Sequence, residues 1–389
     1  MMHPEPNLYQ FQFRSNPEYE LVLYDHLPVE QQHMLNDLQE DEDFYGILRP
    51  AHNNGLGVKS VCRNTALLFL TLKEPSRLPA YIRNIHGFNT EKVIIQLLLD
   101  RVLQIEHNGN FICGAETNSL LQLSNSDLIG EGMISRLSLA AIRYAESLSI
   151  NDITRLSARM YFYNRYPVNP ELQRRYPSQE SISSYLKINR DSHVQNTLNM
   201  DWTQITVNQG NDVWRIFRNK LFDKSFDDSE AIYKLYISPQ FEALHDLFPL
   251  LLDLLTDTQV PRFKIGGNLA SLLRPDKIVC YFQNFEELTN VADILSKKLD
   301  GVSVQGTPFT AEISQDGLLS WGVDPPNNQQ MIGWQERETW RLWITNRLAS
   351  ALISAKTSKD KTIESWQFAL QRLKLDGINT KTWTPTEKL

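Results

Sequence analysis

The stretch Ile232-Tyr233-Lys234-Leu235-Tyr236-Ile237-Ser238-Pro239 decides the fold of the second half of the chain. A short run of β-branched and aromatic residues that a proline ends predicts a strand. Two similar runs follow at 260–266 and 277–282, and helical periods occupy 240–256 and 285–299. The order strand, helix, strand, strand, helix predicts an α+β layer with helices on one face of a mixed sheet.

Polar side chains on these expected strands gather on one face. Lys234 and Tyr236 are two residues apart and therefore point to the same side of a strand. Tyr281 lies four residues beyond Lys277 and shares its face if that strand is regular. Lys264 lies on the strand between them in sequence. Cations that converge over a sheet are costly unless an anion or water meets them, so the pattern predicts an anion site or, alternatively, solvated strand ends.

The first half contains an expected helix followed by a tight turn. Residues 91–105 carry apolar side chains at helical spacing, and Asn108-Gly109 is a strong hairpin signal. A helix that leads into a two-stranded wing is typical of a winged helix. Acidic residues of this helix offset its basic ones, which makes a poor surface for DNA and favours peptide capture by strand addition or in a groove. Residues 64–106 resemble the small domains that bind leader peptides in bacterial peptide-modification pathways.

Chain length and composition limit the possible functions. At 389 residues the chain is too long for one ordinary core and is expected to form several domains. A net charge of −7 argues against nucleic acid as a partner. Three widely spaced cysteines fit neither a disulfide framework nor a zinc ribbon, so no metal is expected. We expect no membrane segment and a cytoplasmic protein, because the first residues lack a signal-peptide pattern.

The three strands and the first helix resemble a known set of enzymes over residues 230–325. The patterns are Tyr-Lys-X-Tyr-X-Ser-Pro, Val-Pro-X-Phe-Lys and Arg-Pro-Asp-Lys-X-Val-X-Tyr-Phe, in this order and spacing. They resemble the phosphothreonine lyase effectors, the lyase domains of class III and IV lanthipeptide synthetases, and especially the HopA-type effector family. Relatives of that last family act as separate lyases in class V lanthipeptide and thioamitide pathways.

The resemblance implies elimination of phosphate from phosphoserine or phosphothreonine in a ribosomally made precursor peptide, without a cofactor. A separate kinase-like protein would phosphorylate the peptide, since the chain lacks kinase motifs. By this resemblance Lys264 is the base and the acid is either Tyr236 or Tyr281. The implied phosphate-binding cations are Lys234, Arg274, Lys277 and one late arginine, either Arg337 or Arg341.

Two other functions compete with this one. The best-known effectors have histidine where Tyr236 stands, which favours a non-catalytic, effector-like or peptide-binding scaffold. A winged-helix regulator is the third hypothesis, and the acidity of the chain speaks against it. The expected domains are an N-terminal arm over 1–42, a winged-helix or peptide-recognition unit over 43–125, a helical connection over 126–205, and a lyase-like α+β domain with C-terminal helices over 206–389.

Overall fold

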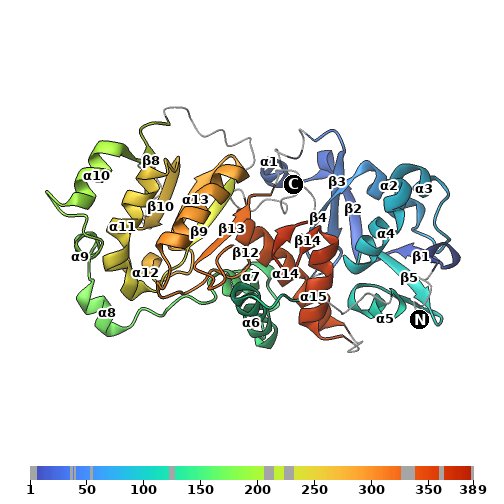
Figure 1. Ribbon diagram of the computed structural model, residues 1–389. Helices are drawn as coiled ribbons and strands as arrows, with labels where there is room; N and C mark the ends of the chain where they lie inside the picture. Colours follow the sequence, from blue (N-terminus) through green and yellow to red (C-terminus); the bar gives the residue numbers. More distant parts are fainter. Residues whose placement is uncertain are drawn as a thin grey trace.

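The computed structural model has an α+β fold in which two sheet-containing parts flank a central group of helices (Figure 1). It describes residues 7–35, 38, 41–52, 56–121, 128–205, 214–222, 232–325, 338–358 and 363–386. No described helix combines the length and the apolar character that a membrane crossing requires.

The larger sheet has seven strands in the order β12-β13-β9-β11-β10-β8-β7. Every neighbouring pair is antiparallel, so the expected sheet forms but its strands are not mixed in direction. The strands are β7 (Trp202–Ile205), β8 (Trp214–Asn219), β9 (Tyr233–Ile237), β10 (Arg262–Gly266), β11 (Ile278–Phe282), β12 (Ala311–Glu312) and β13 (Leu319–Val323).

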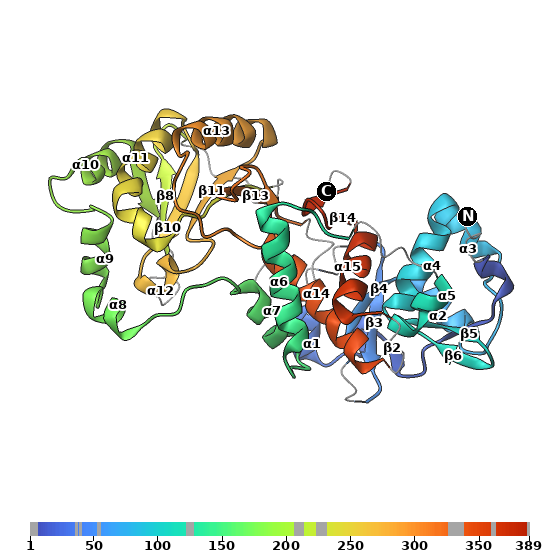
Figure 2. The same ribbon diagram turned by 60° about the horizontal axis from the view of Figure 1, so that its bottom comes forward.

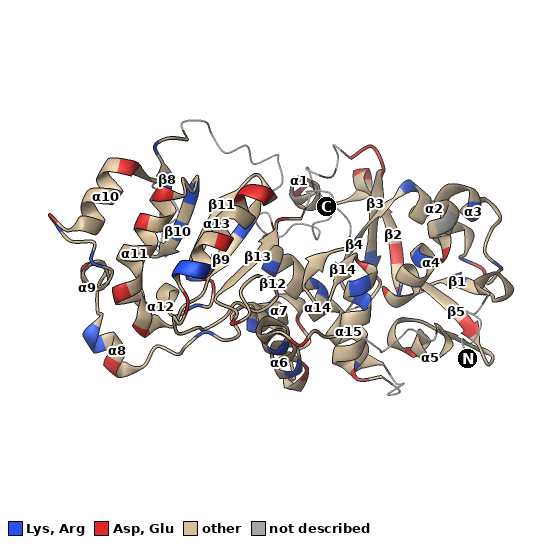
Figure 3. Ribbon diagram, viewed as in Figure 1, with Lys and Arg blue, Asp and Glu red and all other residues tan. Residues whose placement is uncertain are grey.

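Helices cover one face of this sheet, as the sequence predicts. Alternate strand residues such as Leu235, Phe263 and Cys280 are buried in one core with the apolar sides of the helices. The helices are α10 (His193–Asp201), α11 (Leu244–Asp257) and α13 (Phe285–Lys298). Figure 3 shows acidic residues on their outer sides. The intervening strand residues, including Lys234 and Lys264, therefore face away from the helices.

The N-terminal part contains two small sheets and several helices. One sheet has the order β2-β3-β4 and the other has β1-β5-β6. The strands are β1 (Phe13–Ser15), β2 (Tyr19–Leu23), β3 (Phe44–Pro50), β4 (Lys59–Cys62), β5 (Leu103–His107) and β6 (Asn110–Ile112). The helices are α2 (Arg63–Thr71), α3 (Tyr81–His86) and α4 (Thr90–Leu99). The predicted helical unit with a β-wing is confirmed for this region.

The wing forms at the predicted turn, but the helix before it is shorter than expected. Asn108 and Gly109 have φ of 52° and 76° and close a two-residue hairpin between β5 and β6. The helix expected over 91–105 ends at Leu99, because Arg101 adopts a φ of 62° that no α-helix continues. The apolar residues after it belong to β5.

The expected irregular arm over 1–42 is wrong for residues 13–34. β1 pairs with β5, β2 pairs with β3, and α1 (Val29–Met34) follows. Phe13 is fully buried. These early strands complete sheets whose other strands come later in the chain, so local polarity in the sequence did not reveal them.

Four helices join the two parts. They are α6 (Met133–Ser147), α7 (Ile153–Tyr161), α14 (Trp340–Thr357) and α15 (Ser365–Leu375). Trp343 and Phe368 of the last two share a core with Phe13 and Leu98 of the N-terminal part. The C-terminal helices therefore share a core with the first half of the chain (Figures 1 and 2). Only the start of α14 meets the large sheet within the described structure, where Trp340 packs against β13. This departs from the expected boundaries, which placed them with the sheet.

Short elements complete the chain. They are α5 (Asn118–Leu121), α8 (Pro170–Arg175), α9 (Gln179–Tyr185), α12 (Leu269–Leu272), β14 (Ile378–Asn379) and β15 (Thr384–Pro385). α12 matters for the site because it turns the chain between β10 and β11. Gly266 permits this turn, since a Cβ there would lie 2.8 Å from the backbone nitrogen of Leu272.

Candidate active site

The strand register places three cations around the ring of Tyr281. Lys234 on β9 lies opposite Tyr281 on one side, and Arg262 on β10 lies opposite it on the other. Arg262 Cζ is 4.4 Å from the ring centre, Lys234 Nζ 5.7 Å and Lys264 Nζ 5.9 Å. All four residues alternate onto the face away from the helices, as the sequence predicts for Lys234, Lys264 and Tyr281.

Lys264 contacts aromatic rings and, within the part of the chain that the structure describes, no acid. Its Nζ lies 4.3 Å from the ring centre of Trp214, which starts β8. Among the described residues it has no hydrogen-bond or ion-pair partner. Burial lowers the pKa of Lys264; Tyr161 and Asp276 oppose the shift and Arg274 adds to it. A lysine with a lowered pKa has a larger neutral fraction and is a better base near neutral pH.

Arg274 shares the Trp214 ring with Lys264. Its Cζ is 4.9 Å from the centre of that ring, and 5.5 Å and 5.0 Å from the ring centres of Tyr161 and Phe162 at the end of α7. Lys264 Nζ and Arg274 Cζ thus both lie within 5 Å of one ring centre. This geometry brings together the base and one phosphate ligand that the resemblance implies.

Asp276 fixes Arg274 in place. Arg274 Nε and Nη2 donate to its two carboxylate oxygens at 2.8 and 2.7 Å, and Arg341 Nη1 lies 3.0 Å from one of them. Tyr161 Oη donates to the same carboxylate at 3.3 Å. Burial alone would raise the pKa of Asp276, but Arg274 and Arg341 outweigh it and hold the pKa below its usual range. Asp276 therefore remains ionised and orients both arginines.

Arg341 lies behind this carboxylate. Its side chain is 1% exposed, Nε donates to the carbonyl of Pro308 at 3.0 Å, and Nη2 donates to the carbonyl of Tyr161 at 2.7 Å. These contacts leave it as a support for Asp276, not as the exposed phosphate ligand that the resemblance implied. The alternative, Arg337, lies outside the described residues.

Lys234 is also neutralised within the protein. Its ammonium donates to both oxygens of Asp324 at 2.6 and 2.5 Å, and its side chain is 8% exposed. Asp324 also accepts from the backbone nitrogen of Trp340 at 3.0 Å, which ties the sheet to the start of α14. Lys234 thus shares the face of the cluster, but its charge is already matched.

Lys277 does not join the cluster, contrary to expectation. It is fully buried, and its ammonium donates to the carbonyl of Pro239 at 2.6 Å and to the side-chain oxygen of Gln305. Burial lowers its pKa to about 7, and Asp276 and Glu242 limit the shift. It lies just before β11, where the strand alternation that predicted its direction has not begun.

The two candidate acids differ in exposure. Tyr236 is 4% exposed, and burial raises its pKa far above the usual value. Tyr281 is half-buried, and burial raises its pKa to about 12, although Lys234 and Arg262 lower it. Both phenols therefore keep their proton at neutral pH.

Sequence reasoning missed the contribution of α7. The rings of Tyr161 and Phe162 lie against Arg274, and the Tyr161 hydroxyl donates a hydrogen bond to Asp276. Nothing in their spacing indicated this, because they lie more than a hundred residues before Arg274 and Asp276. Asp276 could have been found, since an acid two residues from Arg274 is a close local partner. Among the described residues, no three His, Cys, Asp or Glu side chains come together as a metal site would need.

The chain has distant likenesses among solved structures. It is similar to an effector protein from Pseudomonas syringae pv. syringae strain 61, with 13% identity and a TM-score of 0.41 over 68% of this chain and 100% of that one. An effector from Pseudomonas syringae pv. tomato strain DC3000 gives 12% identity and a TM-score of 0.39 over 66% and 98%. The Chromobacterium violaceum VirA (SpvC) phosphothreonine lyase effector gives 14% identity and a TM-score of 0.25 over 37% and 77%.

Sequence-level comparisons add nothing to these. No family model and no curated protein matches the chain. Identities this low transfer no activity to it.

Proposed function

We propose that the protein is a lyase that eliminates phosphate from phosphoserine or phosphothreonine in a peptide. The observation that carries this proposal is the position of Lys264, whose ammonium has ring faces but no acid beside it within the described structure. An oriented guanidinium, that of Arg274, shares its Trp214 neighbour. A base with a lowered pKa next to a phosphate-binding cation is what such an elimination requires.

The reaction divides between these two residues. The neutral amine of Lys264 takes the Cα proton and becomes an ammonium. The electron pair of the Cα–H bond forms the Cα=Cβ double bond. The Cβ–O bond breaks, and the phosphate leaves with the electron pair of that Cβ–O bond. The product is a dehydroamino acid. Burial favours the neutral amine, so the lowered pKa of Lys264 serves this step.

Arg274 is suited to hold the phosphate. Asp276 occupies its Nε and Nη2, while Nη1 has no hydrogen-bond partner among the described residues. A guanidinium held on one edge presents its other edge in a fixed direction, which is how arginine binds phosphate oxygens. Its aromatic neighbours restrict water around the charge and strengthen this contact.

A phenol supplies the proton to the leaving phosphate. Tyr281 fits this role better than Tyr236, because its half-buried ring lies beside Lys264 and Arg262 while Tyr236 is buried. Its pKa of about 12 makes it a weak acid, which the nearby cations improve as the proton moves.

The substrate we propose is a ribosomally made precursor peptide that a separate kinase-like protein phosphorylates, as in lanthipeptide-type pathways. The sequence resemblance supports this, and so does the lack of kinase motifs in the chain. The test is co-incubation of the protein with a phosphorylated precursor encoded beside its gene. Mass spectrometry should show loss of one phosphoric acid, and a thiol should then add to the product.

Lys264→Ala should abolish this loss and leave phosphopeptide binding nearly unchanged, because proton removal contributes little to ground-state affinity. Lys220→Ala is a matched control, since that exposed lysine bonds the carbonyl of Asn199 away from the cluster. A Lys264→Ala protein that eliminates at the parent rate would exclude Lys264 as the base.

One observation favours a second candidate, a scaffold that binds phosphopeptide without eliminating. Lys234 and Arg341, two of the cations that the lyase resemblance implies, are occupied by Asp324 and Asp276. A parent protein that binds phosphopeptide but never releases phosphate would establish this function.

A further inference from the structure

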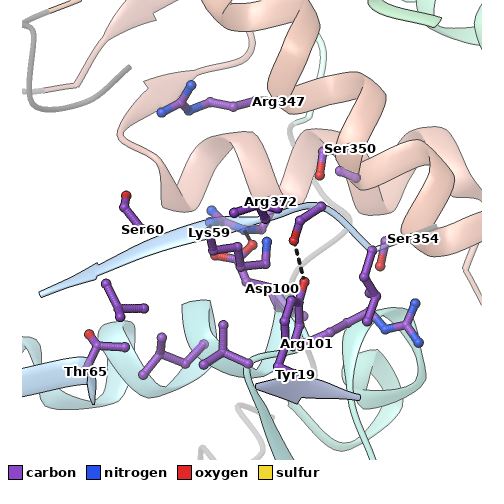
Figure 4. Close-up of a pocket in the computed structure, with 18 of the residues that line it drawn as sticks. Tyr19, Lys59, Ser60, Thr65, Asp100, Arg101, Arg347, Ser350, Ser354 and Arg372 are labelled. Carbon is purple, nitrogen blue, oxygen red and sulfur yellow. Dashed lines mark hydrogen bonds and ion pairs between the residues drawn. The ribbon is translucent and has the colours of Figure 1, made fainter. Parts of the chain in front are cut away.

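A cavity of about 440 Å³ lies between the N-terminal part and the C-terminal helices, away from the sheet that carries Lys264 (Figure 4). Its sides are β4, the end of α4, and helices α14 and α15. In Figure 4, Lys59 and Ser60 lie on a strand that runs beside the helix carrying Ser350 and Ser354.

β4 presents its edge to this cavity. Seven consecutive residues, 56–62, line it, whereas a strand that presented a face would contribute only alternate residues. β4 is also the outer strand in the order β2-β3-β4, and within the described structure no other strand pairs with its outer side. Its outer backbone groups are therefore available for hydrogen bonds along the cavity.

The opposite side of the cavity is formed by small residues. Ser350, Ala351 and Ser354 line it from one stripe of α14, with Arg347 one turn before them. Side chains this small leave room for a peptide backbone between the helix and β4. The hydroxyl of Ser354 is buried and has no hydrogen-bond partner among the described residues, so it is available to a ligand.

The cavity has more basic than acidic residues. Four bases line it, Lys59, Arg101, Arg347 and Arg372, against the two acids Asp100 and Asp376. Arg372 forms ion pairs with Asp100 at 2.7 Å and with Asp376 at 2.6 Å. Arg101 forms one with Glu18 at 3.2 Å. Lys59 has no ion-pair or hydrogen-bond partner among the described residues, so an acidic group in the cavity would complete its contacts.

We propose that this groove binds an extended peptide segment that adds as a strand to the outer edge of β4 and places an acidic side chain against Lys59. The edge supplies backbone hydrogen bonds, the stripe of small residues supplies space, and Lys59 supplies the selectivity for charge. A strand of four residues, Lys59–Cys62, spans roughly 13 Å, so it pairs with about four residues of the ligand. This site does not depend on the elimination chemistry.

The probe is a displayed library of short random peptides, selected on the full-length protein. Selected peptides should alternate β-branched residues with at least one Asp or Glu. On binding they should protect the amide hydrogens of residues 59–62 from exchange. Lys59→Glu should lower the affinity for the selected peptides about tenfold or more, as expected for the loss of a charge-assisted contact. Ser350→Phe narrows the groove and should also lower the affinity for these peptides.

Lys92→Glu is the matched control, because Lys92 is exposed on α4 outside the groove and the charge change is identical. Any of three results would overturn the proposal. The selected peptides could bind Lys59→Glu and Lys92→Glu equally well, they could protect amide hydrogens elsewhere but not those of residues 59–62, or the protein could bind inorganic phosphate and no peptide. Thermal melting of each variant separates lost binding from lost folding. Elimination from a short phosphopeptide that cannot reach the groove should be unchanged in Lys59→Glu, which distinguishes a failure here from a failure of the lyase function.

Discussion

Asp276 receives two hydrogen bonds from Arg274, at 2.7 and 2.8 Å, and Arg274 lies only two residues earlier in the chain. The same carboxylate lies 3.0 Å from Arg341 on α14, which is distant in sequence. One buried acid thus connects the sheet to the central helices and orients the cation that we assign to the phosphate. Its removal should therefore affect both stability and substrate binding.

We expect Asp276→Asn to destabilise the protein by about 3–5 kcal/mol, because two arginines lose the charge that compensates their burial. Denaturant unfolding measures this change. The substrate KM should rise more than kcat falls, since Arg274 keeps its charge but loses its orientation. Wild-type KM in a folded Asp276→Asn protein would show that this carboxylate does not position Arg274.

The pH dependence of elimination should follow Lys264. Because burial lowers the pKa of this amine, kcat/KM should rise with pH and level off below the usual lysine value of 10.5. The neutral amine is the active form, so activity is lost as pH falls through its folded pKa. Pre-steady-state rates of phosphate release across pH measure this limb. A profile that is flat from acid to alkaline pH would contradict the assignment.

Stability should rise with pH through a window that Lys277 sets. Its folded pKa is about 7 against 10.5 in the unfolded chain, so between these values the unfolded state binds more protons. Unfolding free energy therefore increases with pH in this window, and the contribution is lost as pH falls through 7. Lys277→Met should flatten this slope. Lys297→Met, on the exposed end of α13, should keep it.

Strand alternation predicted much of the site, and the reasons for the misses are physical. Lys234, Tyr236, Lys264 and Tyr281 share a face because side chains alternate along regular strands. Lys277 departs because it lies outside the strand, and its ammonium donates instead to the carbonyl of Pro239 and to Gln305.

The contacts that neutralise the cations could not be predicted in this way. Asp324 reaches Lys234 from the end of β13, and Tyr161 reaches Arg274 from α7. Both contacts depend on how distant elements pack, which spacing in the sequence does not encode. The place of the C-terminal helices depends on packing in the same way, since α14 is buried on most of its sides and shares a core with the N-terminal part.

Breaking the buried Lys234–Asp324 pair should separate structural from catalytic cations. Lys234→Met should destabilise the protein by about 3–5 kcal/mol, because Asp324 then remains buried without its cation. Lys234→Met combined with Asp324→Leu should recover much of that loss, since two apolar residues replace the pair. Chemical denaturation of the two variants measures the recovery. If the double variant also keeps its elimination rate, Lys234 is not a phosphate ligand. A double variant that folds but has no activity would show that Lys234 takes part in the reaction.

The choice between the two phenols can be settled by a matched pair of substitutions. Tyr281→Phe should lower the elimination rate on the order of 10²-fold, because it removes the proposed acid and keeps the ring that lies beside Arg262 and Lys264. Tyr236→Phe removes a hydroxyl from a buried position and should change the rate little. The effect of Tyr281→Phe should shrink with substrates whose leaving group is a better one, since a good leaving group needs less protonation. If Tyr236→Phe gives the larger loss and shows that dependence, the acid is Tyr236, and phosphate must approach the site from the side of β9.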